Sequence, residues 1–175
     1  NGVYKRTLNL KEYVACLFHD CSVKSRPDKV KHSLYSAEIA KPILTKTGYF
    51  TPEEVEEVYQ AIVEHDGETN PNFIHSTLTS DVLSSTDTNP PNVAWILNKM
   101  YVYRLRHNRP AELIFKDIAE YSKEAYGLKS KRKYPTLYAN FYGKEIVTMG
   151  RTIDSLTPED CERIIMNYRA RHKLG

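Results

Sequence analysis

The sequence has few cysteines, and they form no recognisable pattern. Its three cysteines, Cys16, Cys21 and Cys161, lack the spacing of zinc ligands. An odd number also argues against a disulfide framework, which small secreted domains use to supplement a small core. We therefore expect a protein of a reducing compartment, the cytoplasm.

Long apolar runs and repeats are absent as well. No stretch could span a bilayer or has the organisation of a signal peptide, so we expect no membrane partner. No linker precedes a second hydrophobic centre, and the 175 residues predict a single domain over 1–175. The net charge of +3 is too small to predict nucleic-acid binding by itself, although it suits an anionic substrate.

Capping signals predict helices along most of the chain. Asn9 precedes Glu12 by three residues, as in a capping box, and the Thr-Pro pairs at 51–52 and 157–158 place a cap before a first-turn proline. Apolar residues recur at helical spacing after each signal. Helices are expected over about 10–21, 30–47, 52–66, 77–84, 92–109 and 111–126 and from 158 onward, with a kink at Pro42.

Strand patterns are scarce. The region 138–150, which contains ANFYGKEIVTMG, fits a short hairpin as well as a broken helix. The sequence therefore predicts an all-α fold, a compact bundle of several helices.

One polar pair follows an unusually apolar segment. Residues 13–18 are apolar on nearly every side at helical spacing, which predicts a buried helix, and His19 and Asp20 come directly after them. A charge beside the core needs a partner. Imidazole and carboxylate groups together suit a first-row divalent cation, so the sequence predicts a metal site assembled from several helices. The candidate ligands are His19, Asp20, His32, His65 and Asp81.

These residues also carry a resemblance. Residues 10–88 resemble the HD-domain metal-dependent phosphohydrolases through four elements in order: ACLFHDCS, the following helix with His32, VYQAIVEHDGE and LTSDVLSSTD. The helices of 89–175 would pack beside them. The resemblance implies an HD-domain-like bundle. It implies that His19, Asp20 and Asp81 bind a divalent ion (Mn, Fe, Co, Ni, Mg or Zn), and that His32 and His65 bind a second ion or the phosphate.

The pattern departs from the family at one point. The family's first ligand is a histidine on a helix preceding the HD pair, and no histidine precedes His19 here. We expect this ligand in a segment upstream of Asn1, because the sequence does not begin with Met. Two alternatives remain open: that His75, His107 or His172 substitutes for it, or that the primary site has degenerated.

The activity implied by the resemblance is hydrolysis of a phosphoester in a nucleotide or a similar small phosphorylated metabolite. Asp20, Lys24, His32 and His65 would be catalytic. Basic residues after the HD pair are placed to meet phosphate oxygens, and Tyr35 lies one turn from His32. The predicted substrate-binding residues are Lys24, Arg26, Lys29, Lys31 and Tyr35.

Other interpretations stay open. The same fold could serve a nuclease or a cyclic-nucleotide phosphodiesterase, with nucleic acid less favoured than a small substrate, or a non-catalytic module that binds a nucleotide or metal. His65 also suits the C-terminus of a helix, where imidazolium is stabilised by the dipole. Asp81 is equally an ordinary helix cap, and we interpret Asp66 and Asp87 as bystanders.

Overall fold

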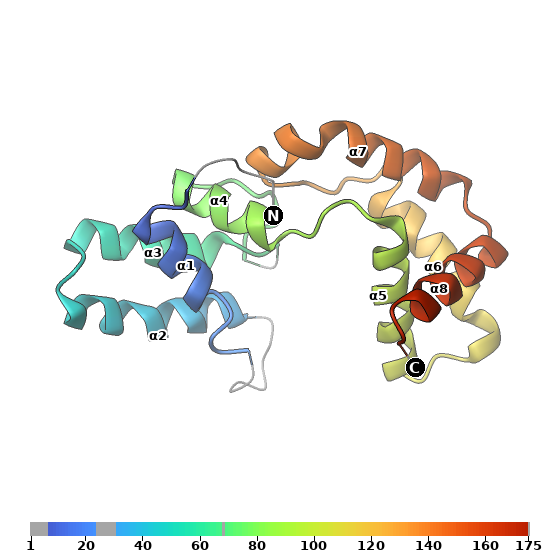
Figure 1. Ribbon diagram of the computed structural model, residues 1–175, viewed down its shortest axis with the longest axis horizontal. Coiled ribbons are helices and arrows are strands. Elements are labelled where there is room, and N and C mark those ends of the chain that lie inside the picture. Colours follow the sequence, from blue (N-terminus) through green and yellow to red (C-terminus); the bar gives the residue numbers. More distant parts are fainter. Residues whose placement is uncertain (1–6, 24–30, 68, 175) are drawn as a thin grey trace. The chain divides into compact units, whose positions relative to one another are not determined.

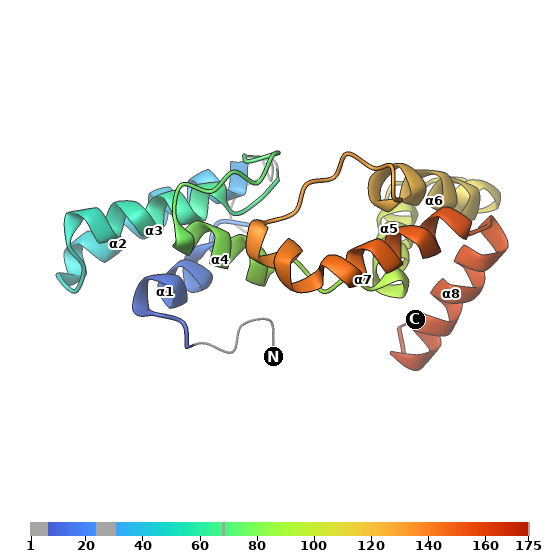
Figure 2. The same ribbon diagram turned by 90° about the horizontal axis from the view of Figure 1, so that it is seen from above.

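The computed structural model describes residues 7–23, 31–67 and 69–174, and in that part of the chain the regular structure is helical (Figures 1 and 2). The all-α prediction is confirmed. The helices are α1 (Leu10–Phe18), α2 (His32–Thr47), α3 (Pro52–Glu64), α4 (Leu78–Asp87), α5 (Val93–Arg106), α6 (Ala111–Tyr126), α7 (Thr136–Ser155) and α8 (Pro158–Arg171). The hairpin considered for 138–150 is not formed, because α7 covers that region, and only Tyr142 in α7 has non-helical backbone angles.

The chain groups into two compact units where the sequence suggested one domain. Unit 1 comprises residues 1–88 and 133–141, and unit 2 comprises 89–132 and 142–175. Each unit has a hydrophobic cluster of its own, and the two clusters share no residue. The apolar side chains therefore bury themselves in two separate cores, and we describe the units one at a time.

Three predicted helix starts are capped as expected. Asn9 accepts a hydrogen bond from the backbone N–H of Glu12, and the Glu12 carboxylate accepts one from the backbone N–H of Asn9, both at 2.9 Å. The same reciprocal arrangement links Thr51 to Glu54 and Thr157 to Asp160. Each cap contributes about 1 kcal/mol, because it satisfies N–H groups that the helix cannot pair internally.

Unit 1 is organised around α3, which packs against α1, α2 and α4. Val58, Ala61 and Ile62 of α3 are fully buried, and small residues face them, with Ala15 on α1 and Ala37 on α2. Small side chains let the helix axes approach closely. As a result, the ends of these helices also come together.

The first helix is not buried all round as the sequence predicted. Leu10, Tyr13 and Leu17 are each more than half exposed, whereas Ala15 is fully buried. The described neighbours of α1 are α2, α3 and α4, and they cover the side that carries Ala15. The opposite apolar side faces outward in the described structure.

Unit 2 contains α5, α6 and α8 and the greater part of α7. Each helix contributes a buried aliphatic residue to its core: Leu97, Ile118, Ile153 and Ile165, all fully buried. None of the described helices in either unit combines the length and apolar character that a membrane crossing requires.

Candidate metal centre

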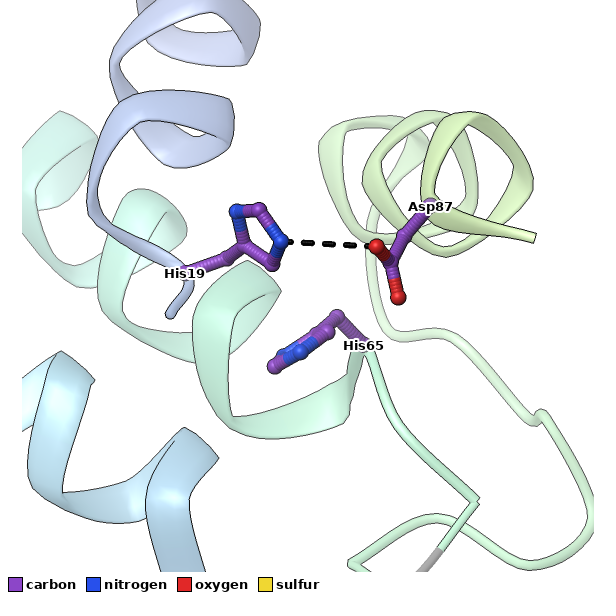
Figure 3. Close-up of side chains that lie close together, drawn as sticks. All are labelled: His19, His65 and Asp87. Carbon is purple, nitrogen blue, oxygen red and sulfur yellow. Dashed lines mark ion pairs between the residues drawn. The ribbon is translucent and has the colours of Figure 1, made fainter. Parts of the chain in front are cut away.

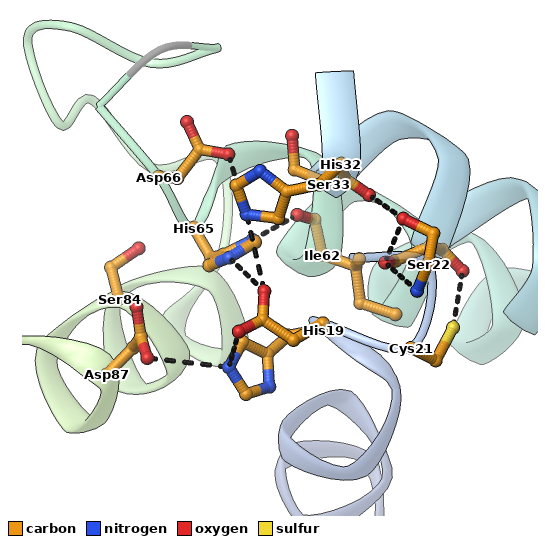
Figure 4. A network of polar contacts seen from close by, with 12 residues as sticks. His19, Cys21, Ser22, His32, Ser33, Ile62, His65, Asp66, Ser84 and Asp87 are labelled. Atoms are coloured by element: carbon orange, nitrogen blue, oxygen red, sulfur yellow. Dashed lines mark hydrogen bonds and ion pairs between the residues drawn. The ribbon is translucent and has the colours of Figure 1, made fainter. Parts of the chain in front are cut away.

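Four helix ends of unit 1 converge on one cluster of imidazoles and carboxylates (Figure 4). His19 and His65 directly follow α1 and α3 as their C-terminal caps, His32 is the first residue of α2, and Asp87 is the last of α4. Helix termini lie at the edge of the core, so side chains at the termini of neighbouring helices can meet there without passing through the core. The cluster therefore follows from the way the helices pack around α3.

The first group of possible ligands is His19, His65 and Asp87 (Figure 3). His19 Nε2 lies 3.4 Å from Asp87 Oδ1. The His65 ring stands nearly perpendicular to the His19 ring, with centroids 5.1 Å apart. One potential ligand atom from each residue lies within 4.8 Å of the other two.

The second group is Asp20, His32 and His65. Asp20 Oδ1 lies 3.3 Å from His32 Nε2 and 3.9 Å from His65 Nε2, whereas Oδ2 lies 3.5 Å from His19 Nε2. The two oxygens of Asp20 thus face different histidines. His65 belongs to both groups, so the two groups share one buried residue.

Backbone carbonyls fix the orientation of two imidazoles. His19 Nδ1 lies 2.8 Å from the carbonyl oxygen of Cys16, and His65 Nδ1 lies 2.6 Å from that of Ile62. A carbonyl can only accept, so Nδ1 carries the proton in both rings. In a neutral imidazole Nε2 then presents its lone pair to the cluster, as in many metal sites. The carbonyls are free to accept because the last turn of a helix leaves them unpaired.

The electrostatics of the cluster depend on burial and on Asp87. The hydrogen bond to Asp87 raises the pKa of His19 to about 9, and the same contact lowers the pKa of Asp87. Burial lowers the pKa of His65 and keeps that ring neutral near pH 7. A divalent ion bound through His19 Nε2 would displace the proton there, so binding would release it to solvent.

The donor set fits a first-row divalent ion. Ligand bonds of about 2.0–2.2 Å place neighbouring ligand atoms about 2.8–3.1 Å apart in octahedral geometry and about 3.3–3.6 Å apart in tetrahedral geometry. His19 Nε2 is 3.4 Å from Asp87 Oδ1 and 3.5 Å from Asp20 Oδ2. His32 Nε2 is 3.3 Å from Asp20 Oδ1. These three pairs require only small movements for coordination, whereas His65 Nε2, 3.9 Å from Asp20 Oδ1, would have to move closer.

Asp87 lies in the described cluster, whereas Asp81, the aspartate predicted from the sequence, does not. The Asp81 carboxylate accepts hydrogen bonds from the backbone N–H of Leu137 at 3.2 Å and from the Ser85 hydroxyl at 3.2 Å, and it lies 3.6 Å from His75 Nδ1. It therefore anchors the start of α7. Asp87 lies six residues later, which is about 120° around α4.

A periodic signal for Asp87 was present in the sequence. Leu83 belongs to the core of unit 1, and Asp87 is one turn beyond it on the same side of α4. Asp66, also interpreted as a bystander, has its Oδ2 3.5 Å from His32 Nε2. Both carboxylates therefore belong to the surroundings of the cluster.

The three histidines considered as substitutes for the missing first ligand are not members of the described cluster. His75 pairs with Asp81 and contacts the Ser84 hydroxyl at 2.8 Å, and His107 and His172 belong to unit 2. Of the predicted phosphate-binding residues, Lys24, Arg26 and Lys29 lie outside the described residues. Lys31 is exposed directly before α2, and Tyr35 is half-buried on it.

Comparisons of this chain with protein-family models, curated proteins and solved structures found no match. The resemblance to the HD-domain phosphohydrolases therefore stays a prediction. The chemical interpretation of the cluster rests on its own geometry.

Proposed function

We propose that unit 1 is a metal-dependent phosphohydrolase that cleaves a phosphoester of a nucleotide or a similar small phosphorylated metabolite. The observation that supports this proposal is the presence of two overlapping groups, His19, His65 and Asp87 and also Asp20, His32 and His65. In each group, possible ligand atoms lie within 4.8 Å of one another. The resemblance of residues 10–88 to HD-domain enzymes supports the choice of reaction.

The residues of the cluster differ in access to solvent, which suggests different tasks. The His65 side chain is 1% exposed and the Asp20 side chain is 52% exposed. His65 would hold the ion from the buried side, together with His19, Asp20 and Asp87. The Asp20 and Asp87 side chains, 52% and 48% exposed, are the carboxylates that water and substrate can reach. Asp20 Oδ1 would accept a hydrogen bond from the attacking water and orient it. A bound divalent ion would lower the pKa of water and offset negative charge on the phosphoryl oxygens.

Metal content and hydrolysis test the proposal together. The purified chain, stripped with a chelator and reloaded with Mn²⁺, Fe²⁺, Co²⁺, Ni²⁺, Mg²⁺ or Zn²⁺ in turn, should retain one or two ions per chain by elemental analysis. It should also hydrolyse members of a panel of nucleoside mono- and triphosphates, cyclic nucleotides and single-stranded DNA. Activity confined to cyclic nucleotides or DNA would favour the phosphodiesterase or nuclease alternative.

A matched pair of histidine variants provides the control. His19 and His172 are each the C-terminal cap of a helix, α1 and α8 respectively. His19→Ala should lose metal and activity, and His172→Ala should keep both. Stoichiometric metal in His19→Ala would contradict the proposal. Metal binding without turnover of any substrate would instead identify a regulatory binding module.

A further inference from the structure

Unit 2 contains a pocket of about 460 Å³ between α5 and α6. This volume lies in the range of sites for small organic ligands. The floor is apolar, with the buried residues Ile96 and Met100, and the walls carry aromatic rings and cationic groups. All lining residues belong to unit 2, so an inference about this pocket does not rest on the proposed function of unit 1.

One side of the pocket is a row of residues on α5. Trp95, Lys99, Tyr103 and His107 follow one another at four-residue steps and so lie along one side of the helix and its cap. The Lys99 ammonium lies 5.3 Å from the centre of the Trp95 ring. The rings of Tyr103 and His107 stack with centroids 4.1 Å apart. This wall therefore combines three aromatic side chains with one ammonium group.

The opposite side is held in place by an ion pair. Arg104 Nε donates to Asp117 Oδ2 at 3.1 Å, and the Arg104 guanidinium lies 5.2 Å from the centre of the Tyr121 ring. The Arg104 side chain is 11% exposed, so the guanidinium is largely shielded from water, whereas the Asp117 side chain is 42% exposed. The half-exposed Tyr121 ring therefore lies in the pocket wall beside the guanidinium.

The charges of the lining do not balance. Among the described lining residues Asp117 is the one acidic residue, and its charge is matched by Arg104. Lys99 and Arg109 add two further positive charges, both on exposed residues. A turn after α5 positions Arg109: its backbone N–H donates to the carbonyl of Arg104 at 3.2 Å, and Asn108 has a left-handed φ of 51°. The pocket therefore favours an anion.

We propose that this pocket binds a nucleoside phosphate. A planar base suits a wall of aromatic rings, because stacking stabilises any base and needs no particular hydrogen-bond pattern. A phosphate suits the exposed Lys99 and Arg109, the latter through two parallel hydrogen bonds. The volume accommodates one nucleotide, and one anion would balance the excess charge.

Intrinsic fluorescence can measure binding to this pocket, because Trp95, which lines the pocket, is the single tryptophan of the sequence. AMP added to the full chain, with a chelator present to prevent hydrolysis in unit 1, should change the fluorescence of Trp95 and saturate. Adenosine and inorganic phosphate, which each supply half of the ligand, should bind at least about tenfold more weakly than AMP. Calorimetry under the same conditions gives an independent Kd.

Paired variants separate stacking from charge. Tyr121→Leu should raise the Kd for AMP about tenfold, whereas Tyr121→Phe, which keeps the ring, should leave it within about twofold. Arg109→Gln should weaken AMP binding and leave adenosine binding unchanged. Arg151→Gln removes an exposed arginine of α7 that does not line the pocket, and it should have no effect.

Several results would overturn the proposal. One is an unchanged Trp95 signal together with no heat of binding. Another is equal affinity for AMP and phosphate, and a third is a single-stranded oligonucleotide that binds tenfold more tightly than AMP. The Asp87→Asn variant of unit 1 should bind AMP at Trp95 as the wild type does, so the outcome is independent of the metal proposal.

Discussion

His19 Nε2 lies 3.4 Å from Asp87 Oδ1, although the two residues come from the ends of different helices, α1 and α4. The contact raises the pKa of His19 and lowers that of Asp87, so each residue stabilises the charged form of the other. His65 lies beside both (Figure 3). In the cluster, Asp87 lies where the sequence predicted Asp81, so we propose Asp87 in its place as the carboxylate ligand.

A comparison of two aspartates on α4 tests that assignment. Asp87→Asn should weaken metal binding at least about tenfold, since even the loss of an outer partner of a ligand has an effect of that size. Asp81→Asn should leave metal binding unchanged, because its carboxylate contacts Leu137, Ser85 and His75. Metal titration followed by calorimetry measures both. Equal losses in the two variants would contradict the assignment.

Metal should also stabilise unit 1 against heat. An ion that binds only the folded state adds about 2.7 kcal/mol of stability at a concentration one hundred times its Kd. We therefore expect Mn²⁺ to raise the Tm of the wild type relative to a sample with chelator, measured by calorimetry. Asp20→Asn should abolish most of this shift, because Asp20 faces His19 through one oxygen and His32 through the other. A full shift in that variant would remove Asp20 from the ligand set.

The stability of unit 1 should fall in mild acid partly because of His75. Burial lowers the pKa of His75, although nearby Asp81 and Glu64 act in the opposite direction. As the pH falls through about 6.5, the unfolded chain takes up a proton at this residue that the folded chain does not, so the folded state loses stability. Urea midpoints at pH 7.5 and 5.5 should differ more for the wild type than for His75→Gln. Identical differences would exclude this contribution.

Two glycines offer a test of packing in unit 2. A Cβ at Gly127 would collide with the carboxylate of Asp154 and the carbonyl of Lys123, whereas a Cβ at Gly143 meets nothing within 4 Å. Asp154 also accepts a hydrogen bond from the backbone N–H of Leu128 at 3.1 Å, so it is not free to move away. Gly127→Ala should destabilise the protein by about 1–3 kcal/mol.

The matched change Gly143→Ala should be neutral or stabilising, because alanine is favoured over glycine in a helix by about 1 kcal/mol. Urea unfolding compares the two variants under identical conditions. A Gly127→Ala protein as stable as the wild type would show that this turn can relax without loss.

Local sequence determined most of the helices. The caps at Asn9, Thr51 and Thr157 involve side chains only three residues apart in the sequence. Such local contacts do not depend on packing between helices, so the sequence alone predicts where these helices begin. His19 and His65 lie at the other ends of α1 and α3, as their C-terminal caps. Their Nδ1 contacts follow locally too, since the partner carbonyls belong to the preceding turn.

Only the tertiary structure decided which residues meet. Asp81 and Asp87 share a helix, and the rotation of α4 against α1 and α3 brings one of them to His19 and His65 and the other to Leu137. The exposed side of α1 depended likewise on which helices cover it, and the two separate cores depended on how the apolar side chains group. Composition and periodicity describe one segment at a time, whereas these outcomes depend on packing between segments distant in the sequence.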